Sequence, residues 1–561
     1  MRPTGAGRFC GAGLSWGGGL SYTFAMREHL PKIVIVVLLL LVVGVPFALR
    51  PAGSEGSAGA GGGEGGQASG DPGARLIVIT PHNEQIRYEL SAGFNRWRAE
   101  QGLPAVTFDW RASGGTTDLR NGILAQFEAK ARQGRVDDGI GADLFFGGGD
   151  YDHGKVASGL TVADADGEQR VMITDVPRLP EGLFEAAFPE PRIGGEPLHH
   201  PERRWIGTAL SSFGIVYNRD LLLMLGDLER PRTWSDLTDP RYADWLAMSD
   251  PGHSGSITTA LNTVLARTGW SEGWADLRRI YANARYFASS STKVPLDVAS
   301  GDAAAGMAID FYGRYQAGAV AKAGWSGDTD GRVTSRVGYV DPLREGVSMT
   351  ATSSDPITLL RGAPHREIAE QFIAWMIGPE AQHLWQAEAG SPGGTLKYEL
   401  RRMPIRPDLY TDEYRRYWVD PEIDPFPTAR PLLPGMNGFR GLISPMSHAM
   451  AIDIHEELKE AWAALRRTPS DHPDHAEMQR LFDELPEALT LRWPDEALEN
   501  QWRAVLRDPG HPRHGEAVAT LEAFTDRLDE RDADQRLADT LEWTEFFRQR
   551  YRKIAEMGQP G

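Results

Sequence analysis

A unit of strand, short polar loop and helix occurs three times in succession after residue 74, and this repetition constrains the fold more than any other feature of the sequence. Each apolar strand ends in small or polar residues, and a segment with helical spacing of its apolar side chains follows. Such alternation predicts an α/β domain built on a doubly wound sheet. The strands are expected at residues 75–80, 106–110 and 142–146.

The loops at the carboxyl ends of these strands are candidate binding segments, because ligands of doubly wound sheets bind there. They are Pro81–Glu84, Ser113–Thr117 and Gly147–Gly149. A further set of strands and helices predicts a second lobe at roughly 206–342, after which the chain returns to the first lobe. The two-lobed domain as a whole is expected over residues 74–400.

An uncharged apolar run, Ile33–Leu49, precedes this domain and has the length of a short membrane-spanning helix. Arg27 and Lys32 come before it, so the positive-inside rule places the N-terminus in the cytoplasm and the domain outside. We expect residues 1–50 to form a cytoplasmic stub and a membrane anchor with its helix at 33–49, and a cleaved secretory signal is the alternative. Residues 51–73 hold ten glycines in 23 residues, which predicts a flexible linker.

The charge balance and the cysteine content exclude several classes of function. The chain holds 59 Lys and Arg against 77 Asp and Glu, a formal charge of −18, whereas nucleic-acid binding needs a basic surface. Cys10 is the one cysteine of the sequence, which rules out intramolecular disulfides and thiolate metal clusters. The sequence has no HExxH, Walker A or EF-hand motif, and Gly252–Ser256 only superficially resembles a hydrolase nucleophile elbow. We therefore expect a binding protein rather than an enzyme, with a hydrolase as an alternative.

Several segments in order along residues 75–390 carry a family resemblance. They are Ile77–Asn83, GIVYNRDLL (214–222), PRTWSDLTDP (231–240), DPGHSGS (250–256), AAGMAIDFYG (304–313) and residues 355–385. The sequence resembles the type II periplasmic solute-binding proteins of ABC importers, and more closely the group for ferric iron, polyamines, thiamine and phosphorylated small molecules. The resemblance implies two lobes that are joined by crossing strands and close like a hinge on a small solute. It also implies a periplasmic location at the cytoplasmic membrane, with separate permease and ATPase subunits as partners.

Small and hydroxylated residues at strand ends give the candidate ligand contacts. Ser254–Ser256 stands where a strand gives way to a helix, and helix-start amides with two hydroxyls suit an anion. The alternative is that such serines only cap their helices. These patterns and the family resemblance together give the candidate ligand-binding residues, which are His82, Asn83, Ser113, Gly114, Gly115, Thr116, Gly148, Ser211, Ser254, Gly255, Ser256, Asp310 and Tyr312.

The ferric-binding relatives give His82, Asp310 and Tyr312 a second interpretation, as ligands of a transported Fe³⁺. Fe³⁺ favours phenolate and carboxylate oxygens and tolerates an imidazole. Phe311-Tyr312 stands where those relatives carry two adjacent tyrosines, so the usual pair is broken. The alternative to metal binding is a structural role, in which His82 caps a helix and Tyr312 fills the wall between the lobes. No resident cofactor is expected. Glycine amides and hydroxyls favour a small anionic solute, or ferric iron with an anion, over a polyamine.

The C-terminal part of the chain predicts an extended strap and a helical extension. The strap is proline-rich and spans residues 401–434, and helical periodicity spans 435–561. Trp462–Arg466 before His472–His475 resembles Trp502–Arg507 before His511–His514, which indicates a duplicated helical hairpin. The paired histidines are candidates for either metal binding or solvated turns. A membrane-anchored sensor that uses the same domain is the alternative to an importer receptor.

Overall fold

The computed structural model describes residues 74–164, 167–322, 336–344, 347–433, 439–529, 531 and 533–559. The predicted anchor at 33–49 and the linker at 51–73 lie outside the described residues. Within the described part of the chain, no helix combines the length and the apolar character that crossing a membrane requires.

The first lobe is built on a mixed sheet with strand order β2-β1-β3-β17-β6, and β9 also pairs with β17. β1 runs parallel to β2 and β3, whereas β17 runs antiparallel to β3, β6 and β9. The strands are β1 (Arg75–Ile79), β2 (Thr107–Arg111), β3 (Leu144–Phe146), β6 (Thr174–Asp175), β9 (Ile206–Ser211) and β17 (Ser353–Leu360). The α/β sheet predicted for the first lobe is therefore confirmed.

Side chains of β1 alternate between two cores, because successive residues of a strand point to opposite faces. Val78 belongs to the cluster that contains Phe94 of α2 (Glu84–Glu100), and Ile77 belongs to the cluster that contains Phe127 of α3 (Thr116–Ala131). Helices thus cover both faces of the sheet, as a doubly wound sheet requires. The other helices of this lobe are α4 (Asp150–Ala157), α5 (Leu183–Ala187), α11 (Arg366–Met376) and α12 (Pro379–Leu384).

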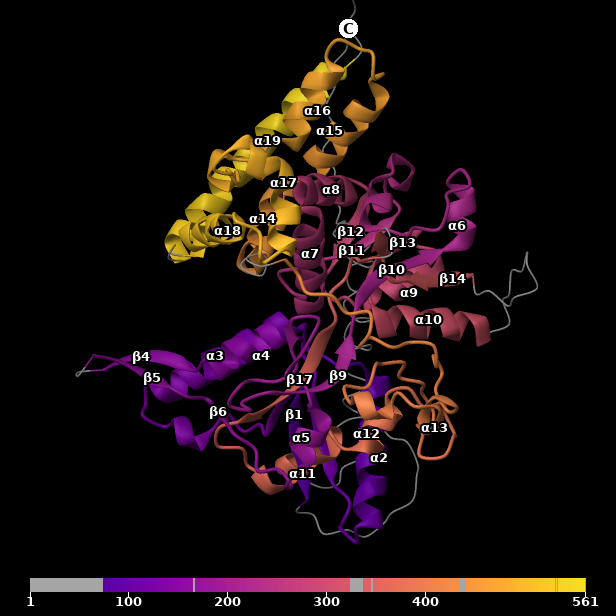
Figure 1. The fold of residues 1–561 in the computed structure, drawn as a ribbon, viewed down its shortest axis with the longest axis vertical. Helices are drawn as coiled ribbons and strands as arrows, with labels where there is room; N and C mark the ends of the chain where they lie inside the picture. Colours follow the sequence, from indigo (N-terminus) through magenta and orange to yellow (C-terminus); the bar gives the residue numbers. More distant parts are fainter. Residues whose placement is uncertain are drawn as a thin grey trace, which may run out of the picture. The chain divides into compact units, whose positions relative to one another are not determined.

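The second lobe has its own sheet, with strand order β12-β11-β13-β10-β14. Its strands are β10 (Phe213–Asn218), β11 (Leu246–Ser249), β12 (Ala284–Ala288), β13 (Ala305–Ile309) and β14 (Val337–Val340). Its helices are α6 (Arg219–Met224), α7 (Gly255–Thr268), α8 (Trp270–Ala282), α9 (Lys293–Ser300) and α10 (Asp310–Lys322). Ser212 joins β9 of the first lobe to β10 of the second, and β17 returns the chain to the first sheet (Figure 1).

Short pairs and turns complete the two lobes. They are β4 (Leu160–Asp164) with β5 (Gly167–Val171), β7 (Arg192–Ile193) with β8 (Glu196–Pro197), β15 (Leu343–Arg344) with β16 (Val347–Ser348), and the 3₁₀ turns η1 (Val136–Asp138), η2 (Trp234–Thr238) and η3 (Pro240–Tyr242).

The helical extension packs on α7 and α8 of the second lobe (Figure 1). The indole of Trp270 donates to the carbonyl of Leu489 at 2.7 Å, and the indole of Trp462 donates to the Asn283 amide oxygen at 2.8 Å. The strap holds η4 (Pro407–Leu409) and α13 (Asp412–Arg415). The extension holds α14 (Arg440–Ser447), the π-helix η6 (His448–Ile452), α15 (His455–Arg467), α16 (His475–Asp483), η7 (Glu487–Leu489), α17 (Glu496–Arg507), α18 (His514–Asp529) and α19 (Ala533–Met557).

The two histidine-containing turns have the same hydrogen bonds, so they form one repeated structural unit. His475 Nδ1 donates to the carbonyl of Thr468 at 3.0 Å, and His514 Nδ1 donates to that of Val505 at 3.0 Å. Each of these histidines begins the second helix of its pair, α16 or α18. The repeat therefore uses these two imidazoles to bridge from the second helix to the end of the first.

Candidate functional site

A cavity of about 50 Å³ lies between the two lobes, where loops after the carboxyl ends of strands from both sheets meet. Its lining residues are Pro81, His82, Gly114, Gly115, Thr116, Gly148, Ser254, Ser256, Ser290, Ser291, Thr292, Ile309, Phe311, Tyr312, Asp355 and Arg402. Most of them lie at the beginnings of α2, α3, α4, α7, α9 and α10. The cavity is thus surrounded by helix N-termini, which carry partial positive charge and backbone N–H donors.

The lobes touch each other beside the cavity. A Cβ atom added to Gly115 of the first lobe would lie 1.9 Å from the backbone oxygen of His253 in the second lobe. The imidazole of His253 also lies 3.3 Å from Asp118 of the first lobe. The structure therefore has the lobes closed on one another around this cavity.

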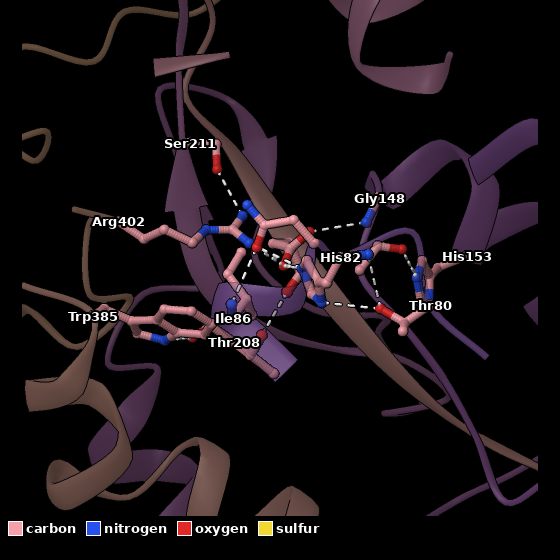
Figure 2. A network of polar contacts seen from close by, with 12 residues as sticks. Thr80, His82, Ile86, Gly148, His153, Thr208, Ser211, Trp385 and Arg402 are labelled. Atoms are coloured by element: carbon pink, nitrogen blue, oxygen red, sulfur yellow. Dashed lines mark hydrogen bonds and ion pairs between the residues drawn. The ribbon is translucent and has the colours of Figure 1, made fainter. Parts of the chain in front are cut away.

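Arg402 lies at the centre of a buried polar network at this cavity (Figure 2). Its guanidinium donates to Asp355 Oδ2 at 2.7 Å and to Ser211 Oγ at 2.8 Å. The guanidinium carbon lies 4.2 Å from the ring centroid of Phe311 and 5.2 Å from that of Trp385. Only 1% of the Arg402 side chain is exposed, so these contacts hold the guanidinium in one place.

The same network sets the charges of His82 and Asp355. Burial lowers the pKa of His82, and Arg402 lowers it further against the opposing effect of Asp355, so the imidazole is neutral. Its Nε2 atom lies 2.9 Å from Asp355 Oδ2, and its Nδ1 atom lies 3.0 Å from the Thr80 hydroxyl. Burial by itself would raise the pKa of Asp355, but Arg402 and His82 bring it well below its usual range. Arg402 and Asp355 therefore form a charge-balanced pair.

Several of the helix starts around the cavity have no side chain as a cap. Gly115 precedes α3, Gly149 precedes α4 and Thr292 precedes α9, in each case without a side-chain hydrogen bond to the first turn. The Ser254 hydroxyl, by contrast, accepts from the backbone N–H of Ile257 at 3.4 Å and so caps α7. First-turn N–H groups without a side-chain acceptor are the donors that an oxyanion satisfies at helix N-termini.

Comparison with known proteins gives a family match over part of the chain. Residues 181–406 match the model of the bacterial extracellular solute-binding proteins. The predicted resemblance to the solute-binding proteins is confirmed. The matched family is one of binding proteins.

Related proteins with lower coverage are also found. The phosphoglycerate transport regulatory protein PgtC of Salmonella typhimurium is 27% identical over 181 residues, which are 32% of this chain and 40% of PgtC. An uncharacterized protein of Haemophilus influenzae is 27% identical over 179 residues, 32% of this chain and 46% of that protein. The chain thus spans less than half the length of these curated relatives.

Solved structures of periplasmic binding proteins are similar at low identity. AfuA of Actinobacillus pleuropneumoniae, with fructose-6-phosphate bound, is 15% identical with a TM-score of 0.45, over 70% of this chain and 98% of AfuA. Iron-bound HitA of Pseudomonas aeruginosa is 15% identical with a TM-score of 0.42, over 64% of this chain and 92% of HitA.

The cavity between the lobes brings together many, but not all, of the residues singled out from the sequence. The predicted residues that line it are His82, Gly114, Gly115, Thr116, Gly148, Ser254, Ser256 and Tyr312. Ser113 is not among the lining residues, and Asn83 caps α2 by accepting from the Ile86 N–H at 3.1 Å. Ser211 accepts a hydrogen bond from Arg402, and Gly255 lines a neighbouring cavity.

The three residues predicted as ferric ligands have different positions. Tyr312 and His82 line the cavity, and burial raises the pKa of Tyr312 to about 12. Asp310 does not line it, because its fully buried carboxylate forms an ion pair with Arg314. Over the described ranges, no group of three or more His, Cys, Asp and Glu side chains is arranged to hold a metal ion.

Arg402, Asp355 and the segment Ser290–Thr292 line the cavity but were not among the predicted residues. Ser290–Thr292 follows β12 and precedes α9, so it carried the same signal as Ser254–Ser256: hydroxyls at a strand end. Asp355 lies within a segment that matched the family. Arg402 offered no local signal, because it lies in the strap and only long-range packing brings it to the cavity.

Proposed function

We propose that this protein is an extracytoplasmic solute-binding receptor of an ABC importer and that its two lobes close over a small anionic solute. The observation that carries the proposal is the set of helix starts, hydroxyls and one fixed guanidinium around the cavity. The match of residues 181–406 to the solute-binding family supports the receptor role. Permease and ATPase subunits would be separate chains, and the apolar run at 33–49 would hold the receptor at the membrane.

The polarity of the lining favours an anion. Among the described lining residues, Asp355 has the one carboxylate side chain, and the guanidinium of Arg402 balances its charge. The helix N-termini then leave the cavity with an excess of donors and partial positive charge. A polyamine would need several carboxylates and aromatic walls to balance its ammonium groups. The lining therefore suits phosphate or carboxylate oxygens.

The relationship with PgtC supports a phosphorylated solute, since the name of that protein refers to phosphoglycerate transport. A phosphoglycerate offers a phosphate and a carboxylate, which two facing sets of helix starts can bind at the same time. Ferric iron with an accompanying anion is the second candidate, because His82 and Tyr312 both line the cavity.

Isothermal titration calorimetry of the purified protein with 3-phosphoglycerate, inorganic phosphate, ferric citrate and spermidine tests the ligand class. Replacing both Ser254 and Ser256 by alanine should weaken binding of the anion by about 1–3 kcal/mol, because buried hydrogen bonds are lost. Asp495→Ala is the matched control, since Asp495 caps α17 in the extension by accepting from the Leu498 N–H at 2.9 Å. Tight binding of spermidine alone would refute the anion proposal, and unchanged affinity in a folded double variant would refute the role of the two serines.

A membrane-anchored sensor is the second candidate function. The name of PgtC describes a transport regulatory protein, and the extension here packs on the binding domain without belonging to its two sheets. Solute uptake in a strain without this protein separates the two functions when the transporter genes are expressed from a constitutive promoter. An importer receptor is then still required for uptake, whereas a sensor is not.

A further inference from the structure

A second cavity, of about 210 Å³, lies beside the solute cavity where both lobes and the extension meet. The first lobe contributes Thr117, Arg120, Tyr151 and Asp152, the second lobe Pro251, Gly252, Gly255 and Thr258, and α14 of the extension Arg440, Gly441 and Ser444. Gly255 is the first residue of α7, directly after the cap Ser254 that lines the solute cavity. The extension therefore reaches the junction of the lobes next to the solute.

Arg440 bonds to the second lobe through the side of its guanidinium that faces α7. Its Nη1 atom donates to the hydroxyl of Thr259 at 2.6 Å, and its Nη2 atom donates to the carbonyl of Gly255 at 3.2 Å. The extension that carries Arg440 is packed on α7 and α8 along its length. Arg440 will therefore stay with the second lobe when the lobes part.

The same guanidinium faces the first lobe. Its carbon lies 4.6 Å from the ring centroid of Tyr151 in α4. Asp150 and Asp152 of α4 lie close enough that Arg440 opposes the rise that burial gives to the pKa of both carboxyl groups. The contact with the Tyr151 ring joins the second lobe to the first, so it would be lost if the lobes parted. An interaction present in one of two conformations shifts the population toward it.

We propose that Arg440 is a positioning residue for lobe closure, through which the C-terminal extension stabilises the closed form and thereby sets solute affinity. The inference rests on the proposed solute-binding function for its effect on affinity, but its effect on closure can be measured without solute. A cation over an aromatic ring in a partly desolvated site corresponds to about a 3- to 30-fold change in the ratio of closed to open molecules.

The test measures the distance between the lobes in the full-length protein. Spin labels at Ala129→Cys in the first lobe and Glu229→Cys in the second, in a Cys10→Ser background, report closure by pulsed electron paramagnetic resonance. Arg440→Gln should move the solute-free distribution toward longer distances and weaken binding of inorganic phosphate or 3-phosphoglycerate by about 3- to 30-fold. Arg440→Lys keeps the charge but not the planar fork, and it should fall between the wild type and Arg440→Gln.

Arg503→Gln is the matched control, since Arg503 joins α17 to Thr268 and Glu272 of the second lobe. It should leave the interlobe distance unchanged. An Arg440→Gln distribution identical to that of the wild type, with and without solute, would overturn the proposal. Should Arg440→Gln fail to fold, Tyr151→Leu removes the first-lobe side of the contact, and unchanged closure in that variant overturns it equally. If no variant binds either phosphate compound, the proposed ligand class fails, while the solute-free distances still decide the role of Arg440.

Discussion

His448 of the extension lies between two carboxylates and links the extension to the second lobe. Its Nε2 atom lies 3.1 Å from Asp250 Oδ1, and its Nδ1 atom lies 2.9 Å from Asp453 Oδ1. The hydrogen bond with Asp250, supported by that with Asp453, raises the pKa of His448 from 6.5 to about 9, although burial opposes the rise. The protonated imidazole is therefore the form that the folded state favours.

A pH dependence of stability follows from this raised pKa. The contribution of His448 is fully present below the ordinary value of 6.5 and is lost as the pH rises through about 9. We expect the free energy of unfolding to fall across that window in the wild type, and His448→Gln to be less stable below it and to lose less across it. Chemical denaturation at pH values on both sides of the window measures this. Wild-type and variant curves that run parallel would contradict the assignment.

Single residues also show what local sequence could and could not predict about the site. Ser254 and Gly115 were identified because a small residue at a strand end is a local pattern. Arg402 was not, because its side chain is brought to Asp355 by the path of the strap, and the two residues are 47 positions apart. Asp310 was assigned to the cavity from its place in the sequence, but Arg314 on the next turn of α10 pairs with its carboxylate.

At the scale of elements, the duplicated hairpins give histidine a structural role. His475 Nδ1 and His514 Nδ1 each bridge two helices through a carbonyl at 3.0 Å. We expect His475→Ala and His514→Ala each to destabilise the extension by about 0.5–1.5 kcal/mol, the usual value for one net hydrogen bond. Thermal unfolding with and without zinc measures both effects. A zinc-dependent rise in the melting temperature that the alanine variants lose would instead favour metal binding.

The order and type of elements were predictable because each strand and helix of the binding domain has a clear apolar pattern. In β1, for example, Ile77 packs in one core and its neighbour Val78 in the other, as expected for a strand buried on both faces. The assignment of β9 to the first sheet was less accessible, since β9 and β10 are both fully buried and only Ser212 separates them. Pairing partners such as β17, far along the chain, decide which sheet such a strand joins.

At the scale of the whole molecule, the apolar run at 33–49 is predicted to hold the protein at the membrane. The full-length protein should then stay in the membrane pellet after washing with high salt and carbonate, whereas a variant that starts at residue 51 should be released. Cell fractionation with immunodetection measures this. A full-length product that is released, with its mature N-terminus after residue 50, would show a cleaved signal instead. If the linker at 51–73 is flexible, its reach is about 26 Å.

The close approach of Gly115 to the His253 carbonyl has a consequence for inheritance as well as for binding. A single methyl group at this position would hold the lobes apart, since a Cβ atom there would lie 1.9 Å from that oxygen. If the protein is an importer receptor, the altered form would still collect solute on one lobe without closing to deliver it. Because closure sets the affinity, that form would bind solute too weakly to compete with an intact receptor in the same cell, so a missense allele at Gly115 would act as a recessive trait.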